Sequence, residues 1–220
     1  MRKMNSKGFT LIELLAVITI MGILMLVAIP AVSRTIENSR RDTFMDTALS
    51  YVNAVKTSVA ADEVKCDDPN EAGKTKLISA LDTGYYYIMF NTAAGNTATD
   101  LMEQGGKSSW GNADVVGVVV VQKTVKDDRN AYKYAVGMVD AVGRGIGSYT
   151  DNTGAIEGLV SDTELDRSDV TTTTGGGRKD FYTANKAAAA KGDFNVKPEK
   201  NATKVDATVM TSANQCEIIM

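Results

Sequence analysis

The feature that most constrains this chain is an apolar run near its N-terminus. From Phe9 to Val32 the sequence contains a single charged residue, Glu13. A helix rises about 1.5 Å per residue, so this run reaches about 36 Å, enough to cross a hydrocarbon core of roughly 30 Å. We therefore expect a membrane-spanning helix over residues 9–33.

Two other interpretations of the run fit less well. A cleaved secretory signal peptide has an apolar stretch of about 7–15 residues that ends in an A-x-A-like site. This run is too long, and the Ala-Ile-Pro-Ala sequence of residues 28–31 matches such a site poorly. A buried core helix would need apolar cover on all sides, which the flanking sequence does not offer.

Basic residues on both sides of the run bear on its orientation. Those ahead of it favour a cytoplasmic N-terminus and are Arg2, Lys3 and Lys7. Those behind it weaken this signal and are Arg34, Arg40 and Arg41. The size of the C-terminal portion favours its export, so we expect a single-pass membrane protein with a cytoplasmic N-terminus.

Glu13 is the informative residue of the run. An ionisable side chain inside a spanning helix costs roughly 2.5–3.5 kcal/mol and usually has a partner. Because the run contains no other charge, this partner would come from another chain or from a newly made N-terminus. In the alternative interpretation, Glu13 lies near the helix end and reaches the lipid headgroups.

The residues around Glu13 form a recognisable motif. The sequence of residues 7–15, KGFTLIELL, follows a short basic leader and closely resembles the prepilin signature of type IV pilins and pseudopilins. The resemblance is strong over residues 1–40 and extends to the remainder only in general architecture. It implies that a prepilin peptidase cuts between Gly8 and Phe9, removes the leader 1–8, and that Phe9 is then N-methylated.

The same resemblance suggests how such a helix is used. It implies that Glu13 pairs with the N-terminal amine on Phe9 of a neighbouring subunit and so sets the stagger of a filament. Pro30 removes a backbone donor and its ring clashes with the preceding turn, so we expect a kink there. The resemblance adds that the stretch from Gly22 to Pro30 can unwind in an assembled filament.

Beyond the apolar run the pattern becomes that of an amphipathic helix half, residues 34–65. Apolar residues recur at steps of three and four, at Phe44, Ala48, Val52, Val55 and Val59. Residues 66–220 are expected to form a globular head. The expected fold class is α+β, with the long helix packed on an antiparallel sheet, as in the type IV pilin fold.

Several elements of the head can be placed from the sequence. The clearest is a hairpin of residues 115–125 and 131–142, whose β-branched runs indicate strands. Its consecutive valines predict a central strand covered on one side by the long helix. Further strands are expected at 85–90, 205–210 and 216–220. Short helices are expected at 74–82, around Leu101 and at 178–191. A turn is expected at 143–147 and a flexible loop at 171–177.

Composition excludes several kinds of chemistry. The chain has no histidine, only two cysteines and a net charge of -3. Ser-His, Cys-His and His-ligated metal sites are therefore absent, and a bulk basic surface for nucleic acid is not indicated. Carboxylate chemistry stays open. The acidic residues around 62–68 lack the order of a calcium loop, and we expect a solvated helix end, without metal or cofactor.

Cys66 and Cys216 would lie outside the cytoplasm, where oxidation is possible. We expect a disulfide between them, and two free buried thiols are the alternative.

The sequence thus predicts a non-enzymatic subunit of a type IV pilus that polymerises with itself into an extracellular filament serving adhesion, twitching motility or DNA uptake. The resemblance implies a prepilin peptidase, an assembly platform with its ATPase, the bilayer before assembly and minor pilins as partners. A pseudopilin of a secretion or competence pseudopilus is the alternative within the family. A membrane-tethered binding or enzymatic domain is the alternative of another class.

Overall fold

The chain divides into two compact units, Met1–Arg40 and Arg41–Met220. The computed structural model describes residues 10–68, 70–71, 73–92, 106–126, 128, 131–147, 159–174, 177–185, 194–196, 208–210 and 214–219. The leader, Phe9 and the helix expected around Leu101 lie outside these residues. The α+β architecture predicted from the sequence, a long N-terminal apolar helix with antiparallel sheets, is confirmed.

The first element, α1, is one helix from Leu11 to Ala60. It ends in a Schellman motif, in which the Glu63 amide donates to the Ser58 carbonyl and the Asp62 amide to the Val59 carbonyl. Asp62 has a φ of 62°, the left-handed conformation that this cap requires. The helix therefore stops short of residue 65, where the sequence placed the end of its amphipathic half.

The main sheet of the head has the strand order β3-β4-β5-β6-β8, with β7 also paired to β5. The pairings between these strands are antiparallel. The strands are β3 (Gly84–Asn91), β4 (Val115–Lys123), β5 (Tyr132–Asp140), β6 (Gly145–Ile146), β7 (Val160–Ser161) and β8 (Val170–Thr171). The expected hairpin is β4 with β5, in a register that sets Val119 opposite Val136.

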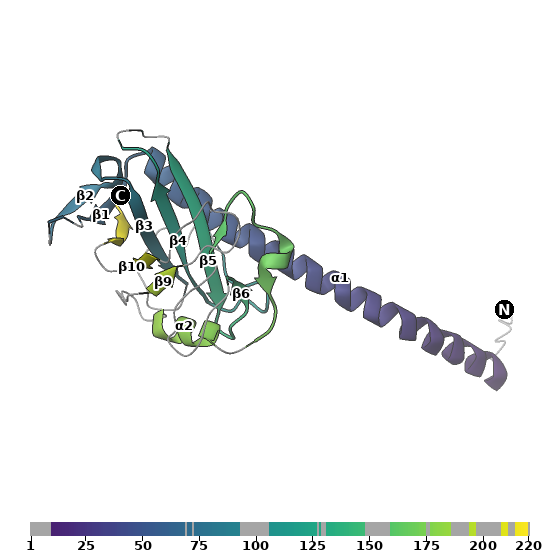
Figure 1. Ribbon diagram of the computed structural model, residues 1–220. Coiled ribbons are helices and arrows are strands. Elements are labelled where there is room, and N and C mark those ends of the chain that lie inside the picture. The colour runs from purple at the N-terminus through teal and green to yellow at the C-terminus, as the bar shows by residue number, and fades with distance from the viewer. Residues whose placement is uncertain are drawn as a thin grey trace, which may run out of the picture. The chain divides into compact units, whose positions relative to one another are not determined.

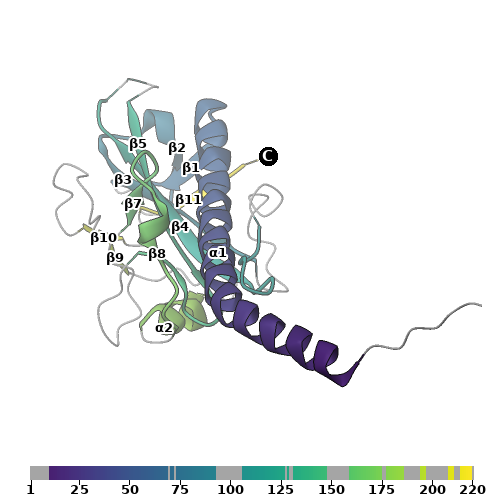
Figure 2. The same ribbon diagram turned by 90° about the vertical axis from the view of Figure 1, so that its right-hand side faces the viewer.

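Both faces of this sheet are covered, whereas the sequence prediction placed cover on one face only. On one face, the C-terminal part of α1 lies along the sheet (Figure 2), and its buried residues from Phe44 to Val59 join one face of the strands in a single core. On the other, Phe181 and Tyr182 of α2 (Gly177–Asn185) join Val116, Val118 and Val120 of β4 in a second core. A strand that is buried on both faces needs a continuous apolar run, which explains the consecutive valines.

A second, three-stranded sheet has the order β11-β1-β2 and ties the C-terminal segment to the end of α1. Its strands are β1 (Val64–Asp67), β2 (Thr75–Leu77) and β11 (Cys216–Ile218). The same segment also touches the main sheet, since Gln215 forms a parallel bridge with Tyr87 of β3. The remaining strands, β9 (Phe194–Val196) and β10 (Thr208–Met210), pair with each other (Figure 1).

Three local predictions are corrected by the structure. The turn expected at 143–147 contains strand β6, which pairs with β5 and β8. The helix expected at 74–82 is strand β2 followed by a short 3-10 helix, Ile78–Ala80, because residues 75–77 pair with β1. The loop expected at 171–177 begins inside β8 and ends at the first residue of α2.

Candidate assembly site

The N-terminal half of α1 exposes apolar side chains all round. Its large hydrophobic residues between Leu11 and Val32 are 48–83% exposed. By length and composition, this helix could cross a membrane. Leaving so much apolar surface in water is unfavourable, at about 25 cal/mol for each Å². The surface therefore requires cover, either by lipid or by other protein chains.

Glu13 and Thr10 form a capping box at the start of α1. The backbone amide of Thr10 donates to Glu13 Oε2 at 2.8 Å, and the Thr10 hydroxyl donates to the same oxygen at 2.6 Å. In return, the Glu13 amide donates to the Thr10 hydroxyl at 3.3 Å. Such a reciprocal pair satisfies amides that would otherwise lack a partner at a helix N-terminus.

The box fixes where the carboxylate of Glu13 lies. Both hydrogen bonds to it end on Oε2, which turns the group back toward the N-terminal end of α1. Among the described residues, no hydrogen bond to Oε1 is recorded. The negative charge therefore remains at the point where the chain continues to Phe9, and Gly8 and Phe9 themselves lie outside the described residues.

Thr10 is a residue that the sequence reasoning missed. The signal was present, because Thr10-Leu11-Ile12-Glu13 has the S/T-x-x-E spacing of a capping box just before an apolar run. With this box, Glu13 has a partner within its own chain. A partner from another chain is then a second contact of Glu13, in addition to the one with Thr10.

Gly22 and Pro30, which bound the stretch expected to kink or unwind, both lie within α1, and the helix runs through them without interruption. A Cβ added at Gly22 would meet no atom of the described residues within 4 Å, so no contact among them requires a glycine there. The kink at Pro30 and the unwinding of this stretch in a filament stay predictions.

Two aromatic contacts help to fix the C-terminal part of α1 to the head. The ring of Tyr51 stacks on that of Phe90 in β3, with centroids 3.9 Å apart and planes 13° from parallel. Phe44 meets Trp110 at a centroid distance of 5.4 Å. Burial raises the pKa of Tyr51 to about 12. This hydroxyl donates to the Gly106 carbonyl, so the ring has one polar contact inside the core.

Ion pairs complete the attachment at the edge of this interface. Lys56 pairs with Asp162 and lies over the ring of Tyr134, 5.4 Å from its centroid. Arg167 donates twice to the carboxylate of Asp42, at 2.6 Å each. The hydrogen bonds from Arg167 to Asp42 raise the pKa of the guanidinium above its ordinary value. Both pairs join α1 to the segment between β7 and β8.

The cysteines lie just beyond the end of α1. Cys66 of β1 and Cys216 of β11 are joined by a disulfide. Of the neighbouring acidic residues, Asp68 pairs with Lys76, and this hydrogen bond lowers the pKa of the carboxyl below its ordinary value. In the part of the chain that the structure describes, no group of three or more Asp, Glu or Cys side chains is placed to hold a metal ion.

Residues 3–29 match the family described as the prokaryotic N-terminal methylation motif. The chain carries a class III signal, which is the prepilin signal of type IV pilins and pseudopilins. Its N-terminal segment is thus that of a type IV pilin or pseudopilin precursor, and the apolar helix fits a membrane-anchored precursor. Comparisons of the chain with curated proteins and with solved structures gave no match.

Proposed function

We propose that this chain is the structural subunit of an extracellular type IV pilus. After cleavage behind Gly8, residues 9–33 would leave the bilayer and form the core of the filament. The observation that carries the proposal is the apolar surface of α1, exposed on every side and interrupted by the single carboxylate of Glu13. The methylation motif over the same residues supports it.

In the proposed assembly step, Glu13 selects and positions each incoming subunit. Cleavage would create a cationic amine on Phe9, about one helical turn from the carboxylate. The amine of a neighbouring subunit can bind the side of the carboxylate that Thr10 leaves unoccupied. Such a charge-assisted pair offsets much of the roughly 2.5–3.5 kcal/mol that a lone carboxylate costs in hydrocarbon.

The proposal implies a sequence of partners. The bilayer holds the precursor, a prepilin peptidase cleaves it, and a membrane platform with its ATPase inserts the subunit into a filament of identical copies, to which minor pilins can be added. No catalytic step is assigned to the chain itself. Adhesion, twitching motility and DNA uptake are all compatible with such a filament, and a short pseudopilus uses the same signal.

A Glu13 series tests the pairing. In Glu13→Gln the capping box can still form, since Gln also occurs at this position of the box, but the charge is lost. In Glu13→Val both are lost. We expect both variants to be inserted and processed, and the yield of sheared surface filaments to fall at least about tenfold in both.

The matched control is Glu164→Gln, at an exposed position of the head. Its filament yield should equal that of the unmodified chain. A normal yield from Glu13→Gln together with a low yield from Glu13→Val would assign Glu13 to the helix cap alone and contradict the pairing. Normal yields from both would contradict any role of Glu13 in assembly.

A further inference from the structure

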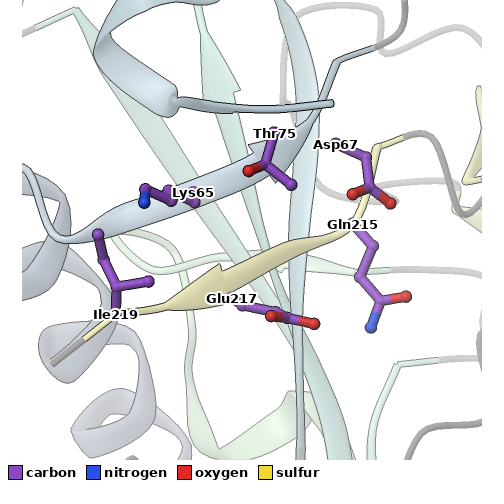
Figure 3. Close-up of a pocket in the computed structure, with 6 residues that line it drawn as sticks. All are labelled: Lys65, Asp67, Thr75, Gln215, Glu217 and Ile219. Atoms are coloured by element: carbon purple, nitrogen blue, oxygen red, sulfur yellow. The ribbon is translucent and has the colours of Figure 1, made fainter. Parts of the chain in front are cut away.

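The exposed face of the small sheet β11-β1-β2 has a hollow of about 230 Å³. Side chains alternate across a strand, and the residues that line the hollow are alternate residues of these segments. The lining residues are Lys65 and Asp67 of β1, Thr75 of β2, and Gln215, Glu217 and Ile219 of the C-terminal segment (Figure 3). This face has no part in the assembly site described above.

The opposite face of the same sheet holds the hollow in a fixed shape. There Val64, Cys66 and Cys216 are buried in the core, and the disulfide joins β1 directly to β11. The Ile219 amide also donates to the Glu63 carbonyl, which continues the pairing past the end of β11. The buried face and the disulfide therefore hold the strands that present the polar face in a fixed arrangement.

Charges of opposite sign lie at the two ends of this face. Lys65 and Glu217 are cross-strand partners in the register of β1 and β11. Figure 3 shows the Lys65 ammonium directed to one side, near Ile219, and the Glu217 carboxylate directed to the other, near Gln215. Both side chains are exposed, and no ion pair between them is recorded within the described residues. Asp67 adds a second carboxylate at the Glu217 end.

A face with a cation at one end and carboxylates at the other is complementary to itself. Two copies can meet face to face about a two-fold axis that lies in the contact plane. If this axis is at right angles to the line from the ammonium to the carboxylates, Lys65 of each copy lies opposite Glu217 of the other. Such an isologous contact needs only one patch. We propose that this face binds the same face of a second copy of the chain, and that this contact joins neighbouring filaments side by side.

The strength of the contact decides where it acts. An exposed ion pair typically gains less than about a fivefold factor in an equilibrium constant, and salt screens it. Two such pairs cannot hold two separate chains together at low concentration. Along a filament the face repeats with every subunit, and many weak contacts then act together. The inference rests on the proposed function, and it predicts salt-sensitive bundles of filaments and no dimers of single chains.

The test measures bundling apart from filament formation. Sheared filaments are prepared from the unmodified chain, from Lys65→Glu, from Glu217→Lys, and from the double swap with both changes. Low-speed sedimentation and negative-stain images at low and at high salt give the bundled fraction, and a high-speed pellet gives the total filament. Lys179→Glu on α2 is the matched control, since Lys179 is exposed and the charge change is that of Lys65→Glu.

We expect each single variant to lower the bundled fraction at least about fivefold at low salt, with total filament unchanged. In these variants the contacting faces of two copies would carry like charges and repel each other. The double swap restores complementarity and should recover most of the bundling, and the control should not change it. Unchanged bundling in both single variants, or no recovery in the swap, would overturn the contact. Loss of total filament in the single variants would also overturn it, because the face would then act inside the filament. Absence of any filament from the unmodified chain would instead contradict the proposed function.

Discussion

Cys66 and Cys216 lie directly opposite each other on neighbouring antiparallel strands, with Cα atoms 3.8 Å apart, and a disulfide joins them. The two residues are separated by 150 positions in the sequence. The bond therefore ties the strand that follows α1 to the last strand of the chain. The C-terminal segment also contacts β3, so the bond fixes it between the two sheets of the head.

The disulfide should be present in protein isolated without reductant. The denatured chain should then take up no alkylating reagent before reduction and two equivalents after it, as measured by intact mass. In the chain-entropy account, a loop of this length stabilises the folded head by at most about 5 kcal/mol. Cys66→Ala/Cys216→Ala should lower the free energy of unfolding by up to that amount. Labelling of both cysteines without reductant would contradict the bond.

Gly117 of β4 gives the ring of Phe90 the space in which it stacks on Tyr51. A Cβ at this position would lie 2.3 Å from the Phe90 ring and 2.5 Å from the Gly137 carbonyl oxygen. Gly117→Ala should therefore displace the ring and destabilise the head by about 1–3 kcal/mol, the usual cost of overpacking a core. Urea unfolding measures the change.

The control for this variant is Gly84→Ala, at the start of β3, where a Cβ would meet no atom closer than 3.7 Å. Its effect on the free energy of unfolding should be much smaller. Equal effects of the two substitutions would show that strand glycines in general, and not the space for Phe90, set the stability.

Alkaline pH should weaken the head through three of its buried tyrosines. Burial raises the pKa of Tyr51, Tyr86 and Tyr134 to about 12, against a value of 10.0 for the unperturbed side chain. Because the folded-state pKa is the higher one, their contribution is complete below about pH 10 and is lost as the pH rises toward 12. The free energy of unfolding should fall across this window, together with the appearance of tyrosinate absorbance. A constant free energy of unfolding across it would contradict the burial of these hydroxyls.

Gly8→Val should block removal of the leader. Glycine has no side chain, so a protease can approach the backbone closely at this position, and a branched side chain prevents it. We expect the full-length chain to accumulate in the membrane, seen as a larger band on immunoblots. Ser6→Val, within the same leader, should be processed normally. Efficient processing of Gly8→Val would place the cleavage elsewhere.

The elements that the sequence predicted well are those with a strong local pattern. The hairpin of β4 and β5 follows from its β-branched runs, and the helix through Val59 follows from its periodicity. The error at residues 74–82 arose because pairing with the preceding strand, β1, outweighs the local propensity of three residues. The valine run of β4 was interpreted as a strand covered on one face only, although a continuous apolar run is typical of a strand buried on both faces. The helix that covers the second face could not be identified from that run.

The features that the sequence did not predict depend on contacts between segments that are distant in the sequence. Lys123, at the end of β4, is 2% exposed and donates to the carbonyls of Ile78, Ser79 and Leu81. A lysine at a strand end is normally expected in solvent, and nothing local marks this one as buried. The hollow on the small sheet likewise depends on strands from both ends of the head. Glu13, in contrast, could be singled out because its motif is contiguous.

The most direct test of the account is the identity of the first residue of the chain in filaments sheared from the cell surface. We predict that intact mass and N-terminal fragment spectra show a chain that begins at Phe9 and carries a methyl group on its amine. A chain that retains Met1 and is recovered as single molecules, with no filament in the sheared material, would contradict it.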